Sequence, residues 1–354
     1  MSLKDLPPAD HALITAALHG FGLAEPTDAR SVADGLMNRN WRVCTREGVW
    51  ALKQVLDVPA DQARRQHQVT RTLAGLGLAV PPPRMTPDGD TLVDVEGIGV
   101  FAVLPWIDGV HRDGRDLTLG ESRHLGGLLA RIHSGLGGHG LASVLAPAPE
   151  SQVVAVTEAA RAKAKIDYYL GLVNNDRVEL DEFDHLVRQR LTERQDLLER
   201  LAYLQPDDTR SVAPVGWVHG DFHDLNLLWS AARPSRITAV LDWDRLRIGP
   251  LAAEVVRTAT LIFGYDLTPE LRALDVARVA AFTAGYREVI PLADASLADA
   301  VHRLWWERVC DFWQLKWHYD KADSSCDHLF VSASALLAWW SEHCNSVSSA
   351  FTTA

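Results

Sequence analysis

Two short apolar segments that end in carboxylates constrain this chain most. The first, residues 218–229, carries Asp221 and Asn226, and the second, residues 240–244, carries Asp242. Each apolar run has the composition of a short buried strand, so its polar residues fall where a strand gives way to a loop. Carboxylate and amide oxygens bind Mg²⁺, and a carboxylate also accepts protons. Together the segments predict a site that combines a base with a cation.

The alternative is that these polar residues are ordinary turn formers and caps. Asp221 and Asp224 favour turns, Asn226 is a typical helix cap, and Asp242 and Asp244 can end a strand in solvent. If that interpretation were correct, both motifs would have arisen by coincidence. We therefore favour a functional site.

The first segment reads His-Gly-Asp-x-x-x-x-Asn and the second reads Asp-x-Asp, in that order. The pair resembles the signature of the aminoglycoside phosphotransferase and choline kinase type of small-molecule kinase, which shares the protein-kinase fold. The resemblance implies that Asp221 is the catalytic base and that Asn226 and Asp242 bind Mg²⁺. It also implies transfer of the γ-phosphoryl group of ATP, or of GTP, to a hydroxyl of a small molecule.

The same resemblance implies an α+β fold with two lobes. An N-terminal lobe over residues 1–104 would hold a five-stranded antiparallel sheet and a helix and would bind the nucleotide. A hinge over residues 105–109 would lead to a mostly helical lobe over residues 110–344, with the catalytic loop and the acceptor site. The Ser/Thr-rich residues 345–354 are predicted to be a frayed tail.

Hydrophobic patterning supports this layout. Alternation and turn residues predict strands at 31–33, 41–45, 49–55, 91–95 and 98–104, and helical spacing predicts helices at 10–23 and 61–76. Further helices are expected at 118–135, 157–172 and 179–204. Thr268-Pro269-Glu270 has the form of a helix start with proline in the first turn, and the chain beyond it is predicted to be helical.

A nucleotide site is implied by the resemblance within the first lobe. Lys53 occupies the position of the strand lysine that pairs with the α and β phosphates, although an exposed lysine on an edge strand is the alternative. The loop of residues 35–40, with Asn38, would lie over the phosphates. The backbone of Leu104 and Trp106 would contact the adenine, whereas Trp106 could instead be a core residue.

One position departs from the family pattern. The helix over residues 61–76 normally supplies a glutamate that pairs with the strand lysine, but the aligned position holds Gln66. A neutral Gln66 can still accept a hydrogen bond from Lys53 through its amide oxygen, but it cannot form an ion pair. Either the usual bridge is missing or the alignment is wrong by one helical turn.

The acceptor site is predicted from aromatic residues in the C-terminal part. Trp306 and Trp313 recur at helical spacing beside Asp311, and Asp244 is the last residue of the second segment. These residues could form an aromatic floor with polar groups for the acceptor, since ligand pockets are mostly apolar with a few polar groups. The alternative is that the tryptophans are packed in the core.

Composition excludes several classes of protein. A chain of 354 residues with 47% hydrophobic and 23% charged residues is typical of a globular protein with about two lobes. A net charge of −11 argues against a nucleic-acid partner. We expect a cytoplasmic protein without membrane partners, because no apolar run is long enough to cross a bilayer. The expected partner is a small-molecule acceptor, and the oligomeric state stays open.

Three functions remain in consideration. The first is a kinase that phosphorylates a sugar-bearing or nucleoside antibiotic and confers resistance or self-protection. The second is a metabolic kinase of the homoserine, choline or methylthioribose type. The third is a pseudokinase that binds nucleotide without turnover, which Gln66 supports and the complete set of Asp221, Asn226 and Asp242 opposes.

Overall fold

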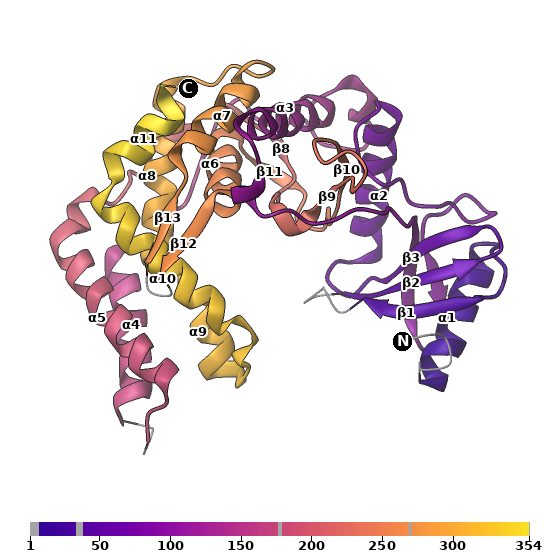
Figure 1. Ribbon diagram of the computed structural model, residues 1–354, viewed down its shortest axis with the longest axis horizontal. Helices are drawn as coiled ribbons and strands as arrows, with labels where there is room; N and C mark the ends of the chain where they lie inside the picture. The colour runs from indigo at the N-terminus through magenta and orange to yellow at the C-terminus, as the bar shows by residue number, and fades with distance from the viewer. Residues whose placement is uncertain (1–6, 33–37, 176–178, 269–270, 354) are drawn as a thin grey trace. The chain divides into compact units, whose positions relative to one another are not determined.

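The chain divides by its internal contacts into two units. The computed structural model describes residues 7–32, 38–175, 179–268 and 271–353 (Figure 1). The first unit comprises Met1–Arg112, Arg131–Ala148 and Trp217–Ile248, and the second comprises Asp113–Ala130, Pro149–Gly216 and Gly249–Ala354. Within the described residues, none of the helices has the length and apolarity that a bilayer span requires.

An antiparallel sheet of five strands forms the centre of the first unit. Its strands, in the spatial order β1-β2-β3-β5-β4, are β1 (Asp28–Val32), β2 (Arg39–Thr45), β3 (Gly48–Gln54), β5 (Gly99–Pro105) and β4 (Val93–Val95). Every neighbouring pair is antiparallel. The predicted five-stranded antiparallel sheet is confirmed.

Two helices pack on this sheet, α1 (Pro8–Gly20) and α2 (Ala60–Gly75). Leu52, Phe101 and Val103 are fully buried in one core with the apolar residues of α1. Ala102, between the last two in sequence, is instead buried with Ala63 of α2. Because successive strand residues point to opposite faces, α1 and α2 cover the two sides of the sheet.

The first unit also contains a small hairpin, β9 (Leu227–Trp229) with β10 (Ile237–Val240), and two short 3₁₀ helices, η3 (His139–Leu141) and η5 (Asp224–Asn226). Helix α3 (Leu119–Leu136) begins in the second unit and ends in the first. It begins with a capping box, because the Glu121 amide donates to the Thr118 hydroxyl and the Thr118 amide donates to the Glu121 carboxylate. Strand β8 (Val215–Val218) begins in the second unit and ends in the first, and strand β11 (Arg247–Pro250) begins in the first and ends in the second.

The second unit is mostly helical, as expected. Its helices are α4 (Ala159–Asn175), α5 (Glu182–Leu201), α6 (Leu251–Ile262), α7 (Val276–Arg287), α8 (Asp294–Cys310), α9 (Trp313–Leu315), α10 (Asp327–Glu342) and α11 (Cys344–Thr352). Two short strand pairs accompany them, β6 (Gln152–Val153) with β7 (Ser211–Val212), and β12 (Gly264–Thr268) with β13 (Leu271–Leu274). Single helical turns are η2 (Gly114–Asp116), η4 (Ala202–Leu204), η6 (Lys316–Asp320) and η7 (Ser324–Cys326).

The helix start predicted at Thr268 is wrong. Thr268 ends β12, and the chain continues as β13 before α7 begins at Val276. Pro269 and Glu270 lie outside the described residues. The helix is capped instead by Asp275, whose carboxylate accepts a hydrogen bond from the Arg278 amide. A Thr-Pro pair suits a turn as well as a helix start, so the local pattern did not distinguish the two.

The frayed tail expected over residues 345–354 is also wrong, because most of it forms α11. Val347 and Phe351 are fully buried, and α11 contacts α7 and α8. These two apolar residues lie one helical turn apart in a Ser/Thr-rich segment. Packing of Val347 and Phe351 against the rest of the protein stabilises the helix, although the surrounding Ser and Thr residues have weak helix propensity.

His67 on α2 makes the stability of the protein depend on pH. Burial and the positive charge of Lys53 lower the pKa of His67 to about 4, and the ring contacts the Thr91 hydroxyl at 2.9 Å. The unfolded chain takes up this proton near its ordinary pKa of about 6.5. The neutral ring therefore stabilises the fold above about pH 6.5, and this stability is lost as the pH falls toward 4.

We expect His67→Gln to remove part of this pH dependence. The free energy of unfolding should differ between pH 7.5 and pH 5 by roughly 1–2 kcal/mol less in His67→Gln than in the wild type. Urea denaturation at the two pH values measures it. His11→Gln, which changes an exposed histidine of α1, is the control. An unchanged pH dependence in His67→Gln would contradict the assignment.

Candidate active site

The loop that carries Asp221 depends on a glycine. Gly220 has φ +85°, in the left-handed region, two residues after the end of β8. A Cβ atom at this position would lie 2.2 Å from the main-chain oxygen of Arg245. Glycine alone satisfies both the backbone conformation and the close approach, which explains the middle residue of the His-Gly-Asp motif.

His219 links the two segments that the sequence analysis singled out. Its side chain is fully buried, and its Nε2 lies 3.0 Å from the main-chain oxygen of Leu241. The Asp221 amide donates to Nδ1 of the same ring at 3.3 Å. The two contacts are satisfied together when Nε2 carries the proton. The ring also packs against Trp243, with 4.6 Å between ring centroids.

The β9–β10 hairpin positions Asn226 close to Asp221 and Asp242. Leu227 pairs with Val240, so Asn226, which precedes β9, lies opposite Leu241, which follows β10. The Leu241 amide donates to the main-chain oxygen of Asn226 at 2.8 Å. The Asn226 side-chain nitrogen donates to the main-chain oxygen of Asp221 at 2.9 Å. Asp221, Asn226 and Asp242 therefore gather at one end of the hairpin.

The donor set at this end fits a divalent cation. Asp242 has φ +54°, a conformation that aspartate tolerates better than most residues. Burial raises the pKa of its carboxyl, Lys53 opposes the shift, and the negative charges of Asp244 and Asp221 add to it. A cation bound by the Asp242 carboxylate would relieve this repulsion. With its nitrogen bound to Asp221, Asn226 would offer its amide oxygen.

His223 is a site residue that the sequence analysis missed. Its Nε2 lies 3.5 Å from Asp221 and its Nδ1 lies 3.7 Å from Asp224. Burial disfavours the charged ring, but the two carboxylates outweigh it and raise the pKa of His223 to about 9. The positive charge favours the ionised form of Asp221, the form that accepts a proton. The position of His223 between Asp221 and Asp224 in the motif could have identified it from the sequence.

Lys53 lies beside two carboxylates of the second segment, Asp242 and Asp244. Its ammonium is 2.7 Å from Oδ2 of Asp244 and 3.8 Å from Oδ1 of Asp242. The side chain is only 19% exposed, so it is not the exposed edge lysine of the alternative interpretation. Asn38 donates to the same oxygen of Asp244 at 2.8 Å. Of the loop expected over the phosphates at residues 35–40, residues 35–37 lie outside the described residues, and Arg39 and Asn40 belong to β2 instead.

Two of the predicted roles change in this arrangement. Asp244 was assigned to the acceptor, but its carboxylate contacts Lys53 and Asn38. Gln66 was expected to hydrogen-bond Lys53, but its amide donates to the main-chain oxygen of Asp244 at 3.1 Å. Both differences arise from contacts between residues far apart in the sequence.

The predicted hinge residues lie at the end of β5. Leu104 pairs with Ala51 of β3, and the Trp106 amide donates to the Val49 oxygen at 3.1 Å. The Trp106 indole donates to Asp108. The Trp106 amide is therefore already used by the sheet, and contact of Leu104 and Trp106 with adenine stays a prediction.

The predicted acceptor residues in the second unit have different environments. Trp306 is 1% exposed and its indole donates to the Thr157 oxygen, which favours the core interpretation. Trp313 is 39% exposed at the start of α9. The Asp311 carboxylate accepts from the Trp313 amide. Only Trp313 keeps the exposure that a wall of an acceptor site requires.

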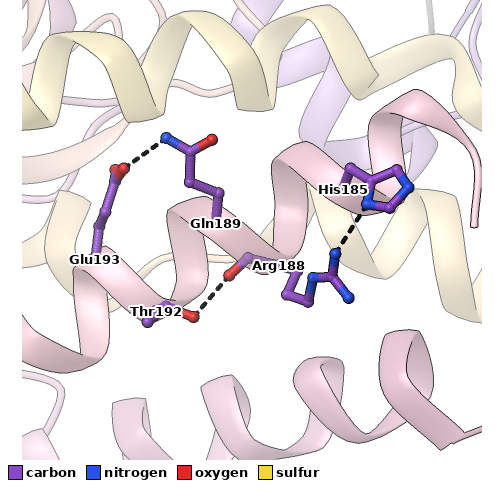
Figure 2. Close-up of a pocket in the computed structure, with 5 residues that line it drawn as sticks. All are labelled: His185, Arg188, Gln189, Thr192 and Glu193. Atoms are coloured by element: carbon purple, nitrogen blue, oxygen red, sulfur yellow. Dashed lines mark hydrogen bonds between the residues drawn. The ribbon is translucent and has the colours of Figure 1, made fainter.

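A surface hollow on α5 does not compete with this site. It is lined by His185, Arg188, Gln189, Thr192 and Glu193, all of one helix (Figure 2). Gln189 donates to Glu193, the Thr192 hydroxyl donates to the Arg188 oxygen, and the Arg188 side chain contacts His185. These side chains form hydrogen bonds with one another along the helix, and their arrangement does not indicate a catalytic or binding site.

Comparison with known proteins agrees with this geometry. The phosphotransferase enzyme family matches residues 28–292. A spectinomycin phosphotransferase in complex with ADP and spectinomycin is 14% identical, with a TM-score of 0.63 over 100% of this chain and 98% of that chain. A microcompartment-associated aminopropanol kinase is 18% identical, with a TM-score of 0.59 over 95% and 98%. An amicoumacin kinase in complex with AMP-PNP, Ca²⁺ and its antibiotic is 17% identical, with a TM-score of 0.55 over 94% and 95%.

No curated protein sequence matches the chain. The fold and the arrangement of the site define an enzyme of the small-molecule kinase class. Since the family matches most of its length, the chain belongs to the phosphotransferase enzyme family. The predicted resemblance and the predicted fold are confirmed.

Proposed function

We propose that this enzyme transfers the γ-phosphoryl group of ATP to a hydroxyl of a small molecule, and that its acceptor is a sugar-bearing or nucleoside antibiotic. The observation that supports the reaction is the gathering of Asp221, Asn226 and Asp242 at one end of the hairpin. Lys53 lies within 3.8 Å of Asp242, beside the same segment. Lysine is the side chain that binds phosphates in this fold.

Each residue then has a distinct role in the proposed reaction. Asp221 accepts the proton of the acceptor hydroxyl, and His223 favours its ionised form. Asn226 and Asp242 would hold Mg²⁺, which would neutralise charge on the phosphates. Lys53 contacts phosphate oxygens of the nucleotide. ATP is the proposed nucleotide, and GTP is the alternative.

The acceptor class is supported by the similar structures and by the second unit. A spectinomycin phosphotransferase and an amicoumacin kinase are each crystallised with their antibiotic and a nucleotide. Trp313 offers an exposed aromatic surface beside Asp311, which suits a ring-bearing acceptor. The similarity to an aminopropanol kinase favours a metabolic kinase as the second candidate.

The test is a phosphorylation assay on a panel of acceptors. Aminoglycosides, nucleoside and peptide antibiotics, homoserine, choline, methylthioribose and aminopropanol are each incubated with ATP and Mg²⁺, and products are examined by mass spectrometry. We expect one antibiotic to gain a single phosphate, and chelation of Mg²⁺ to abolish the reaction. Asp242→Ala should lower turnover at least about 100-fold, because it removes a cation ligand. Asp90→Ala, in an exposed ion pair with Arg64, is the control.

The outcomes separate the candidate functions. Turnover of only homoserine, choline, methylthioribose or aminopropanol would overturn the antibiotic acceptor and favour the metabolic kinase. Nucleotide binding without turnover of any compound would favour the pseudokinase. A product formed equally well by Asp242→Ala would place the cation site elsewhere.

A further inference from the structure

The counter-ion of Lys53 does not come from helix α2. The lysine ammonium lies 2.7 Å from Oδ2 of Asp244, at the far end of the Asp-x-Asp motif. The two side chains are 19% and 12% exposed. An ion pair with this little solvent is weakly screened, so it can hold the lysine in one position.

Asp244 is itself fixed by other contacts. Asn38 donates to Oδ2 of Asp244 at 2.8 Å. The position of Asn38 is set by the amides of Leu56 and Asp57, which donate to its side-chain oxygen at 2.9 and 3.3 Å. The Asp244 carboxylate therefore holds two donors, the Lys53 ammonium and the Asn38 amide, in a defined arrangement.

Helix α2 contributes to this arrangement through a neutral side chain. Gln66 is 4% exposed, and its amide donates to the main-chain oxygen of Asp244 at 3.1 Å. A glutamate at this position could not donate that hydrogen bond. Gln66 thus holds the backbone of Asp244 while the Asp244 carboxylate holds Lys53.

We propose that Asp244 is the positioning residue for Lys53 and replaces the missing carboxylate of α2. This inference rests on the proposed function, since it assigns the way in which the phosphate-binding lysine is oriented. In the alternative role, Asp244 competes with the nucleotide for Lys53, and the nucleotide has to break the ion pair before it can bind the lysine. The two roles predict opposite changes in nucleotide affinity when the carboxylate is removed.

The test is a double-mutant cycle on nucleotide binding and on turnover. Titration calorimetry with ATP and Mg²⁺ compares the wild type with Asp244→Asn, Lys53→Met and the double variant. We expect each single change to weaken binding about tenfold, and the double variant to bind like Lys53→Met, because directly interacting residues are not additive. Asp90→Asn, which changes the exposed partner of Arg64, is the matched control and should bind like the wild type.

A reciprocal variant distinguishes positioning from folding. Asp244→Asn combined with Gln66→Glu returns a carboxylate to α2, and recovery of part of the lost affinity would support the charge as the property that matters. Melting temperatures of all variants show whether a loss of binding reflects unfolding. If Asp244→Asn does not fold, Asp244→Glu keeps the charge and should retain nucleotide binding within about threefold.

Four results would overturn the inference. Additive losses in the double variant would show that Asp244 acts separately from Lys53. Tighter binding by Asp244→Asn would show the competing role. If Asp244→Asn bound nucleotide like the wild type while Lys53→Met bound it more weakly, the positioning role of Asp244 would be rejected and the proposed function would stand. Absence of nucleotide binding by the wild type would reject the proposed function together with this inference.

Discussion

Asp221→Asn should lower turnover by about 10²- to 10⁴-fold while leaving the affinity for ATP with Mg²⁺ within about twofold of the wild type. The base acts on the acceptor hydroxyl, so its loss affects the transition state far more than nucleotide binding. Asparagine keeps the size of the side chain, and the Asp221 oxygen that accepts from Asn226 belongs to the main chain. Single-turnover kinetics with a saturating acceptor measures the change.

Asp224→Asn is the matched control for this experiment. Asp224 contacts the other nitrogen of the His223 ring, at 3.7 Å, so the variant removes a comparable negative charge from the same histidine. We expect its turnover to fall less than about tenfold. Equal losses in the two variants would mean that the charge around His223 matters rather than a base at Asp221. Near wild-type turnover of Asp221→Asn would remove Asp221 from the mechanism.

Gly220→Ala should destabilise the protein by about 3 kcal/mol or more and abolish turnover. The added methyl group would lie 2.2 Å from the Arg245 oxygen, so one of the two loops has to move. Gly97→Ala separates this clash from backbone strain, because Gly97 has φ +73° but no atom lies within 4 Å of its Cβ position. It should cost only about 1 kcal/mol. Urea denaturation measures both, and equal losses would show that strain alone is responsible.

The parts of the site that depend on local sequence were predictable. His-Gly-Asp-x-x-x-x-Asn and Asp-x-Asp each combine a short strand with a turn, and the structure brings both to one hairpin end. The five strands followed from alternation between buried and exposed residues, although their ends shifted by a few residues. Lys53 was placed from its strand, and its low exposure agrees with an internal position.

The partners of those residues were not predictable from local pattern. Lys53 and Asp244 lie 191 positions apart, and no periodicity connects them. Trp306 and Trp313 share one helical spacing, yet one is 1% exposed and the other 39%, because the helix that contains Trp306 ends before Trp313. The Ser/Thr-rich end was misassigned for the same reason, since tertiary packing outweighs weak local preference.

The buried His219 ring also has a consequence for local unfolding. One nitrogen holds the Leu241 oxygen and the other accepts the Asp221 amide, so neither loop can open while the ring keeps both contacts. Local openings of a folded protein occur in cooperative units rather than residue by residue. The loop with Asp221, the proposed base, and the loop with Asp242, the proposed cation ligand, should therefore exchange their amide hydrogens as one unit. A fluctuation that displaces either loop would displace both residues.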